Sequence, residues 1–238
     1  MKKIAHRGIS AQAPENTRSA FEKMITLSVD WLETDIDITS DGELVLIHDN
    51  KVDRTSDSSG SVNDMSLRDL QKLDFGRWFG EEFTGERIVT LDWLIDFINQ
   101  QQINVNFELK TDVKGDKQQF YLTHVCQALR RVSTKVEMIV SSFDVNMLKK
   151  FHALMPEVVI GVLVENQLPD NLVAIAKSVG ASYVHPDGDY LTKEQTQELI
   201  DNHLQINVWT VNDSVMANKL QRWRIQAVFT DFPKVTSL

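Results

Sequence analysis

Cysteine is nearly absent from this chain of 238 residues, in which Cys126 is the only thiol. One cysteine cannot form an intramolecular disulfide and cannot supply a zinc site made of several thiolates. The stretch around Cys126 looks helical, and a buried, inert thiol is far more common there than a nucleophile. Disulfide scaffolds and multi-cysteine zinc proteins are therefore excluded.

Long apolar runs and clusters of positive charge are also missing. The longest apolar run, residues 158–164, is too short to cross a bilayer, and residues 1–8 hold two lysines without the apolar run of a secretory signal. The net charge is −9, which argues against nucleic acid as a partner. We expect a cytoplasmic protein without stable membrane association, whose partner is a small molecule such as a phosphate ester.

The glycine-rich turn G-x-G-x-x-G, typical of open dinucleotide-binding sheets, does not occur either. The chain instead alternates short apolar runs with amphipathic stretches. The expected strands are residues 3–6, 31–38, 103–109, 137–141, 158–164, 183–185, 206–211 and 227–230. Strands alternating with helices, in a chain near the usual length of about 250 residues, predict an α/β fold, the TIM (β/α)8 barrel, as one domain over residues 1–238.

Capping residues indicate where several helices begin. The expected caps are Asn16, Thr90, Asp144, Thr192 and Asn212. Thr192 is followed three residues later by Gln195, which is the capping-box pattern. These starts agree with helices between the strands of a barrel.

Residues 50–87 interrupt this alternation, because they leave no room for a full strand-helix repeat. Loops of this length inside a compact domain are usually functional. We predict a small cap subdomain over the barrel mouth, inserted between the second strand and the second helix. Its aromatic residues Phe75, Trp78, Phe79 and Phe83 are expected to hold it in place.

Three acidic residues lie near the ends of expected strands. Glu33 and Asp35 are two positions apart on the second strand, so their side chains point to the same face. Glu108 ends the third strand, and active sites of such barrels gather at the carboxyl ends of the strands. Carboxylates that point inward together are either exposed at the rim or held by a cation, and oxygen ligands suit Mg2+ or Ca2+. We predict one divalent cation at Glu33, Asp35 and Glu108.

Two histidines and two cations complete the expected site. His6 ends the first strand and His48 follows the apolar run 44–47, so two imidazoles can flank a phosphate and act as acid and base. Arg7 offers a planar fork for phosphoryl oxygens, and Lys110 lies beside the carboxylates. A lone histidine after a strand is usually structural. Here four motifs with complementary chemistry all fall at strand ends: His6-Arg7-Gly8, Glu33-Thr-Asp35, His48-Asp49 and Glu108-Leu-Lys110.

The remaining histidines are weaker candidates. His124 lies in an expected helix, and His152 and His203 lie near expected helix ends, so we interpret all three as structural. His185 ends the sixth strand and can reach the mouth, so its role stays open. It is left out of the predicted site.

The order of these motifs resembles that of glycerophosphodiester phosphodiesterases of the cytoplasmic bacterial type. The resemblance covers the entire chain and rests on His6-Arg7-Gly8, Ala13-Pro-Glu-Asn-Thr17, Glu33-Thr-Asp35, His48-Asp49, Glu108-Leu-Lys110, Trp209-Thr210 and Thr230-Asp231-Phe-Pro233. The sequence departs from the family pattern in lacking a proline before Thr90-Leu91 and in reading Phe-Glu-Leu-Lys around Glu108. Both departures keep the charged residues.

The resemblance implies a TIM barrel with a small inserted subdomain, and metal-dependent hydrolysis of glycerophosphodiesters to sn-glycerol 3-phosphate and an alcohol. It implies that His6 and His48 are the acid/base pair and that Trp209 lines the glycerol pocket. Arg7 and Lys110 would bind phosphate, while the three carboxylates would hold the metal. Attack by water or by the neighbouring glycerol hydroxyl, the leaving alcohol, the choice between Mg2+ and Ca2+, and the oligomeric state stay open.

Two other functions compete with this one. A phospholipase acting on intact membranes could share the barrel and the paired histidines, but it would need a membrane-facing surface. A binding protein that has lost catalysis would usually have lost a histidine or a carboxylate, and here none is replaced.

Substrate presentation separates the phospholipase from the diesterase. We expect turnover of water-soluble glycerophosphocholine and no turnover of intact phospholipid vesicles, measured as release of glycerol 3-phosphate and of headgroup. Hydrolysis confined to the vesicles would contradict the assignment.

Overall fold

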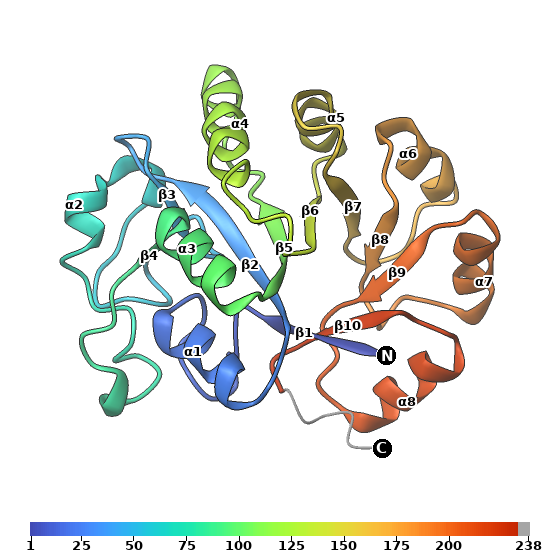
Figure 1. Cartoon of the computed structure of the whole chain (residues 1–238), viewed down its shortest axis with the longest axis horizontal. Helices are drawn as coiled ribbons and strands as arrows, with labels where there is room; N and C mark the ends of the chain where they lie inside the picture. Colours follow the sequence, from blue (N-terminus) through green and yellow to red (C-terminus); the bar gives the residue numbers. More distant parts are fainter. Residues whose placement is uncertain (233–238) are drawn as a thin grey trace.

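Parallel strands close into a ring in the computed structural model, which describes residues 1–232 and, for Asp116, only the backbone. Within this part of the chain the ring consists of β1 Lys2–His6, β2 Trp31–Ile38, β5 Asn104–Leu109, β6 Met138–Ser142, β7 Val159–Val164, β8 Tyr183–Pro186, β9 Gln205–Val208 and β10 Ala227–Thr230. β1 pairs with β10 and also with β2, which closes the barrel. The predicted TIM barrel is confirmed (Figure 1).

The strands begin and end close to the predicted positions. The exception is β9, for which residues 206–211 were expected. The chain leaves the sheet after Val208, and Trp209 forms an isolated bridge with Asp187. Pro233, the last residue of a motif on which the family resemblance rests, lies outside the described residues.

Helices surround the ring of strands (Figure 1). They are α1 Arg18–Thr26, α3 Leu91–Gln101, α4 Asp116–Leu129, α5 Val145–Leu154, α6 Leu172–Val179, α7 Lys193–Asp201 and α8 Ser214–Arg222. On α3 the residues Leu91, Leu94, Ile95 and Ile98 form one buried stripe at the i, i+3, i+4, i+7 spacing. Each such side chain stabilises the fold by roughly 1.5–3 kcal/mol on burial. Within residues 1–232, none of the helices is both long and apolar enough to cross a membrane.

Most predicted helix starts are confirmed. Thr90 and Asp144 accept hydrogen bonds from the first turns of α3 and α5, and Thr192 forms the expected capping box with Gln195. Each cap satisfies a backbone N–H that has no partner within the helix, which is worth about 1 kcal/mol.

Two predicted caps are wrong by one residue. Thr17 caps α1 in place of Asn16, and Asp213 caps α8 in place of Asn212. Both asparagines instead donate side-chain hydrogen bonds to carboxylates at the barrel mouth. Asn16 also has a left-handed backbone with φ 56°, a conformation that asparagine tolerates better than most residues.

The segment 50–87 connects the two short strands of an antiparallel ribbon that pairs with β2. β3 Leu44–Leu46 pairs with β2 and β4 Val89–Thr90 pairs with β3, and between them lie η1 Val62–Asp64, α2 Leu67–Leu70 and η2 Glu81–Phe83. A separate small cluster of buried apolar residues supports this part: Val45, Ile47, Val52, Val62, Leu70, Phe75 and Ile88. Asn63 ties the segment to β2 by donating to the Asp37 carboxylate.

The aromatic residues of this segment differ in their packing. Phe75 belongs to the buried cluster as expected. Trp78 is 41% exposed, so the expectation that it holds the segment down is wrong. Its indole N–H already has a partner in the Phe75 carbonyl, and its ring meets Phe79 edge-on at the surface.

The turn after β1 has room only for glycine. Gly8 has φ +83°, and a Cβ built on it would lie 2.8 Å from the Ala20 Cβ and 2.9 Å from the Ala20 carbonyl carbon. The turn that carries His6 and Arg7 therefore packs directly on α1. The missing side chain of Gly8 allows this close approach.

Gly8→Ala should lower the free energy of unfolding by about 2–5 kcal/mol, because left-handed strain costs roughly 1–2 and overpacking roughly 1–3. Gly85→Ala is the matched control, since Gly85 has φ +95° but nothing within 4 Å of its built Cβ. The control should lose only the strain, about 1–2 kcal/mol. Equal losses in denaturant titrations of the two variants would contradict the packing argument.

Candidate active site

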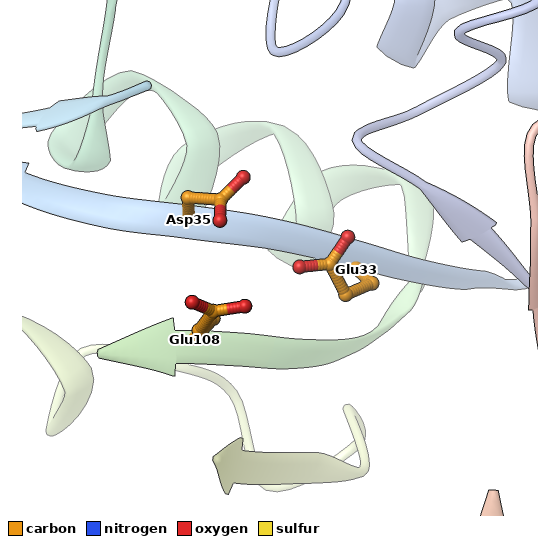
Figure 2. Close-up of side chains that lie close together, drawn as sticks. All are labelled: Glu33, Asp35 and Glu108. Atoms are coloured by element: carbon orange, nitrogen blue, oxygen red, sulfur yellow. The ribbon is translucent and has the colours of Figure 1, made fainter. Parts of the chain in front are cut away.

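Three carboxylates from two neighbouring strands converge at the carboxyl end of the barrel. Glu33 and Asp35 project from the same face of β2, and Asp35 is the register partner of Glu108 on β5. Figure 2 shows the three carboxylates grouped between these strands. One oxygen of each lies within 4.8 Å of the others, and all three residues are buried. The spacing predicted from sequence therefore does bring these residues together.

The triad is electrostatically expensive without a cation. Burial and the neighbouring carboxylates raise the pKa of Glu33 well above its usual range and that of Glu108 to about 7. Burial acts on Asp35 as well, but Lys110 and Arg7 outweigh it and hold its pKa below the usual range. Oxygen-only ligands of this kind fit a hard divalent ion, so the triad could hold one.

Lys110 and Arg7 supply positive charge beside the triad. The Lys110 Nζ lies 3.0 Å from a Glu108 oxygen and 3.4 Å from an Asp35 oxygen. The Arg7 Nη1 donates to Glu15 at 3.0 Å, while its Nε is buried, 3.7 Å from Asp35, and has no hydrogen-bond partner among the described residues. Burial opposes both charges, but the carboxylates raise both pKa values. The Lys110 and Arg7 side chains therefore stay positively charged although they are buried.

Each of the two histidines is oriented by a carboxylate. The Nδ1 of His6 lies 2.7 Å from Asp231, and the Nδ1 of His48 lies 2.6 Å from Asp49. This contact engages Nδ1 of each ring, and Nε2 has no hydrogen-bond partner among the residues that the structure describes. Sequence reasoning did not assign these roles to the two aspartates. Asp49 adjoins His48 and could have been found, whereas Asp231 is 225 residues away from His6.

The carboxylates themselves are held by amides and hydroxyls. Asp231 accepts from Asn212 at 2.6 Å and from Ser10 at 2.9 Å. Burial would raise the pKa of Asp231, but hydrogen bonds from His6 and Asn212 lower it to about 2. Asn16 donates to Asp35 at 3.0 Å in the same way. The two asparagines that were expected to cap helices therefore orient the acidic groups of the site.

One pocket gathers most of the predicted residues. It is lined by His6, Arg7, Glu33, His48, Asn106, Glu108, Ser141, Phe143, Leu163, Trp209 and Phe229. The charged groups come from the first half of the chain, and the opposite wall is largely apolar. On that wall the Trp209 ring meets Phe143 edge-on, with 5.8 Å between the ring centroids. Asp35 and Lys110 are not part of this lining and lie buried behind it.

His185, whose role the sequence left open, lies fully buried inside the barrel wall. Its ring packs edge-on against Phe229, and its carbonyl accepts from the Trp209 indole. Burial lowers the pKa of His185 to about 3, so the ring is neutral. It supports the pocket wall and does not line the pocket.

Comparison with known proteins places the chain in a family. The sequence model of the glycerophosphoryl diester phosphodiesterase family matches residues 6–235. The chain is 32% identical to a glycerophosphodiester phosphodiesterase of Caldanaerobacter subterraneus and 36% identical to YhdW of Bacillus subtilis, in each case over 97% of this chain and 94% of the other. A phosphodiesterase of Oleispira antarctica, solved in complex with the product sn-glycerol-3-phosphate, superposes with a TM-score of 0.94 at 29% identity, covering 100% of this chain and 96% of that one.

The family match spans nearly the whole chain and includes the strand ends that build the pocket. The chain belongs to the glycerophosphoryl diester phosphodiesterase family and is a phosphoric diester hydrolase.

Proposed function

We propose that this hydrolase uses a divalent cation, bound by Glu33, Asp35 and Glu108, to cleave glycerophosphodiesters into sn-glycerol 3-phosphate and an alcohol. One observation carries the proposal: a buried triad fit for a cation adjoins the pocket lined by two carboxylate-oriented histidines. The product bound by the Oleispira antarctica phosphodiesterase supports a small glycerophosphate substrate. When bound, the cation supplies Lewis acidity to a phosphoryl oxygen.

The two histidines act as the acid/base pair. One imidazole accepts the proton of the attacking oxygen, and the other donates a proton to the leaving alkoxide. Burial lowers the pKa of His48, although Asp35 works in the opposite direction, so His48 is neutral at pH 7 and able to accept. Both water and the neighbouring glycerol hydroxyl are compatible with this arrangement.

The phosphate and the glycerol of the substrate are proposed to contact different walls of the pocket. The Arg7 Nε makes no hydrogen bond within residues 1–232, so it can donate to a phosphoryl oxygen, and Lys110 adds positive charge from behind the pocket. Trp209, on the opposite apolar wall, is the proposed contact for the glycerol carbons. Both parts of the substrate are then fixed beside the histidines.

Several finer features stay predictions. The cation is proposed to be Mg2+ or Ca2+, which share oxygen ligands. Residues 50–87 are proposed to form a small cap within a single domain over residues 1–238. This is supported by the contact of Arg54, from this segment, with Glu15 and Asp49 at the site. The cytoplasmic location also stays a prediction.

His6→Ala and His48→Ala should each lower metal-dependent release of glycerol 3-phosphate by roughly 10²- to 10⁴-fold, because each removes one proton transfer. His124→Ala, a histidine on α4 outside the site, should match the parent. Coupled-enzyme assays and melting temperatures check the result. A parent protein that releases no glycerol 3-phosphate from several headgroup diesters, with any divalent ion, would favour the binding-protein alternative.

Binding of Mg2+ should strengthen as pH rises through about 7, the pKa of Glu108, because protonated carboxyls must lose their protons to bind. This pKa is raised above its ordinary value of 4.5, so the metal-free fold loses stability as pH rises from 4.5 toward 7. The cation should restore that stability. Calorimetry in buffers of different ionisation enthalpy measures the released protons.

Glu108→Gln should abolish this binding. Asp37→Asn is the control, since Asp37 is a buried carboxylate of β2 that is not one of the three grouped ligands and accepts a hydrogen bond from Asn63. Affinity that is flat with pH, or parental binding by the Glu108 variant, would contradict the site.

A further inference from the structure

Arg54 bridges two carboxylates at the edge of the active site. Its Nε and Nη2 donate to Asp49 at 2.7 and 3.0 Å, and its Nη1 and Nη2 donate to Glu15 at 2.7 and 2.8 Å. One guanidinium therefore makes two bidentate pairs at once. Only the planar fork of arginine can do this, since the lysine ammonium is a point charge.

Each of these carboxylates also holds a group of the proposed site. The Asp49 Oδ1, which accepts from the Arg54 Nη2, also lies 2.6 Å from the His48 Nδ1. The Glu15 Oε1, which accepts from the Arg54 Nη2, also accepts from the Arg7 Nη1 at 3.0 Å. An unbroken chain of charged hydrogen bonds thus runs from His48 through Arg54 to Arg7.

The charges along this chain depend on Arg54. Its hydrogen bonds hold the pKa of Asp49 well below the usual range. They help to keep Glu15 ionised as well, although burial opposes that charge. Without the guanidinium, two carboxylates that share one partner would face each other and repel. Both would then be free to rotate away from His48 and Arg7.

The other histidine is held differently. Asp231, the partner of His6, accepts from the neutral donors Asn212 and Ser10. Arg54 comes from the segment 50–87, so its side chain also attaches this segment to the site. A defect at Arg54 should therefore act directly on His48 and Arg7, and on the cation-binding triad only through the 3.7 Å contact of Arg7 with Asp35.

We propose that Arg54 is a positioning residue. Through Asp49 it orients the His48 imidazole, and through Glu15 it orients the Arg7 guanidinium. The inference rests on the roles proposed above for His48 and Arg7. Arg54 does not touch the reacting atoms; it keeps the base and the phosphate fork at one fixed separation. Misplacing a reacting group by about 1 Å can cost on the order of 10²-fold in rate.

Arg54→Met and Arg54→Lys test this role on glycerophosphocholine with saturating Mg2+. The methionine variant should lose roughly 10- to 100-fold in kcat/KM, and the lysine variant should recover only a small part, because it restores charge without the fork. Arg77→Met is the matched control, since Arg77 lies in the same segment, and its side chain is 63% exposed and forms an ion pair with Glu81 at 3.4 Å. It should match the parent.

Two further readouts separate positioning from structural damage. Millimolar methylguanidinium should restore activity to Arg54→Ala, whereas methylammonium should not. On an Asp49→Asn, Glu15→Gln background, Arg54→Met should have little additional effect, because the groups through which it acts are already gone. Mg2+ affinity should change far less than kcat/KM, because Glu33, Asp35 and Glu108 are all kept in these variants.

The outcomes distinguish this inference from the proposed function. If His48→Ala is inactive while Arg54→Met retains parental kcat/KM, the inference fails and the proposed function stands. If Arg54→Ala loses activity and melting temperature together and methylguanidinium does not rescue it, Arg54 is structural and the inference also fails. If His48→Ala retains parental activity, the proposed function itself fails.

Discussion

Three carboxylates buried side by side are the constraint around which the mouth of this barrel is organised. Glu33, Asp35 and Glu108 lie within reach of a single ion, although burial opposes the charge of each and their mutual repulsion raises two of the three pKa values. The register between β2 and β5 puts them there, and Lys110 and Arg7 limit the repulsion. A cation that binds the folded form alone would stabilise the protein by mass action. In the proposed function, stability and chemistry are therefore coupled at one place.

The polar residues around the triad act mainly on orientation. Asp49 and Asp231 each hold a histidine by Nδ1, and Asn212 in turn holds Asp231. Such layers limit the freedom of the reacting groups before the substrate arrives, so less conformational entropy is lost in the transition state. In the proposed mechanism, function therefore depends on residues that do not contact the substrate.

The barrel and its acidic centre could be predicted from sequence because both depend on short-range patterns. Strand-helix alternation predicts the parallel ring, and the two-residue spacing of Glu33 and Asp35 on a strand puts them on one face. The supporting contacts could not be predicted in this way. Asn16 looked like a helix cap because local patterns do not show that Thr17 takes that role and that Asp35 lies within reach. The contact between His6 and Asp231 spans 225 residues and depends on barrel closure.

Anomalous diffraction from crystals grown with Mn2+ would show whether the triad binds the proposed catalytic cation. Mn2+ prefers the same oxygen ligands as Mg2+. We expect an anomalous peak bonded to one oxygen each of Glu33, Asp35 and Glu108. A peak elsewhere at full Mn2+ loading, or none while Lys110 keeps its contacts with Asp35 and Glu108, would contradict it.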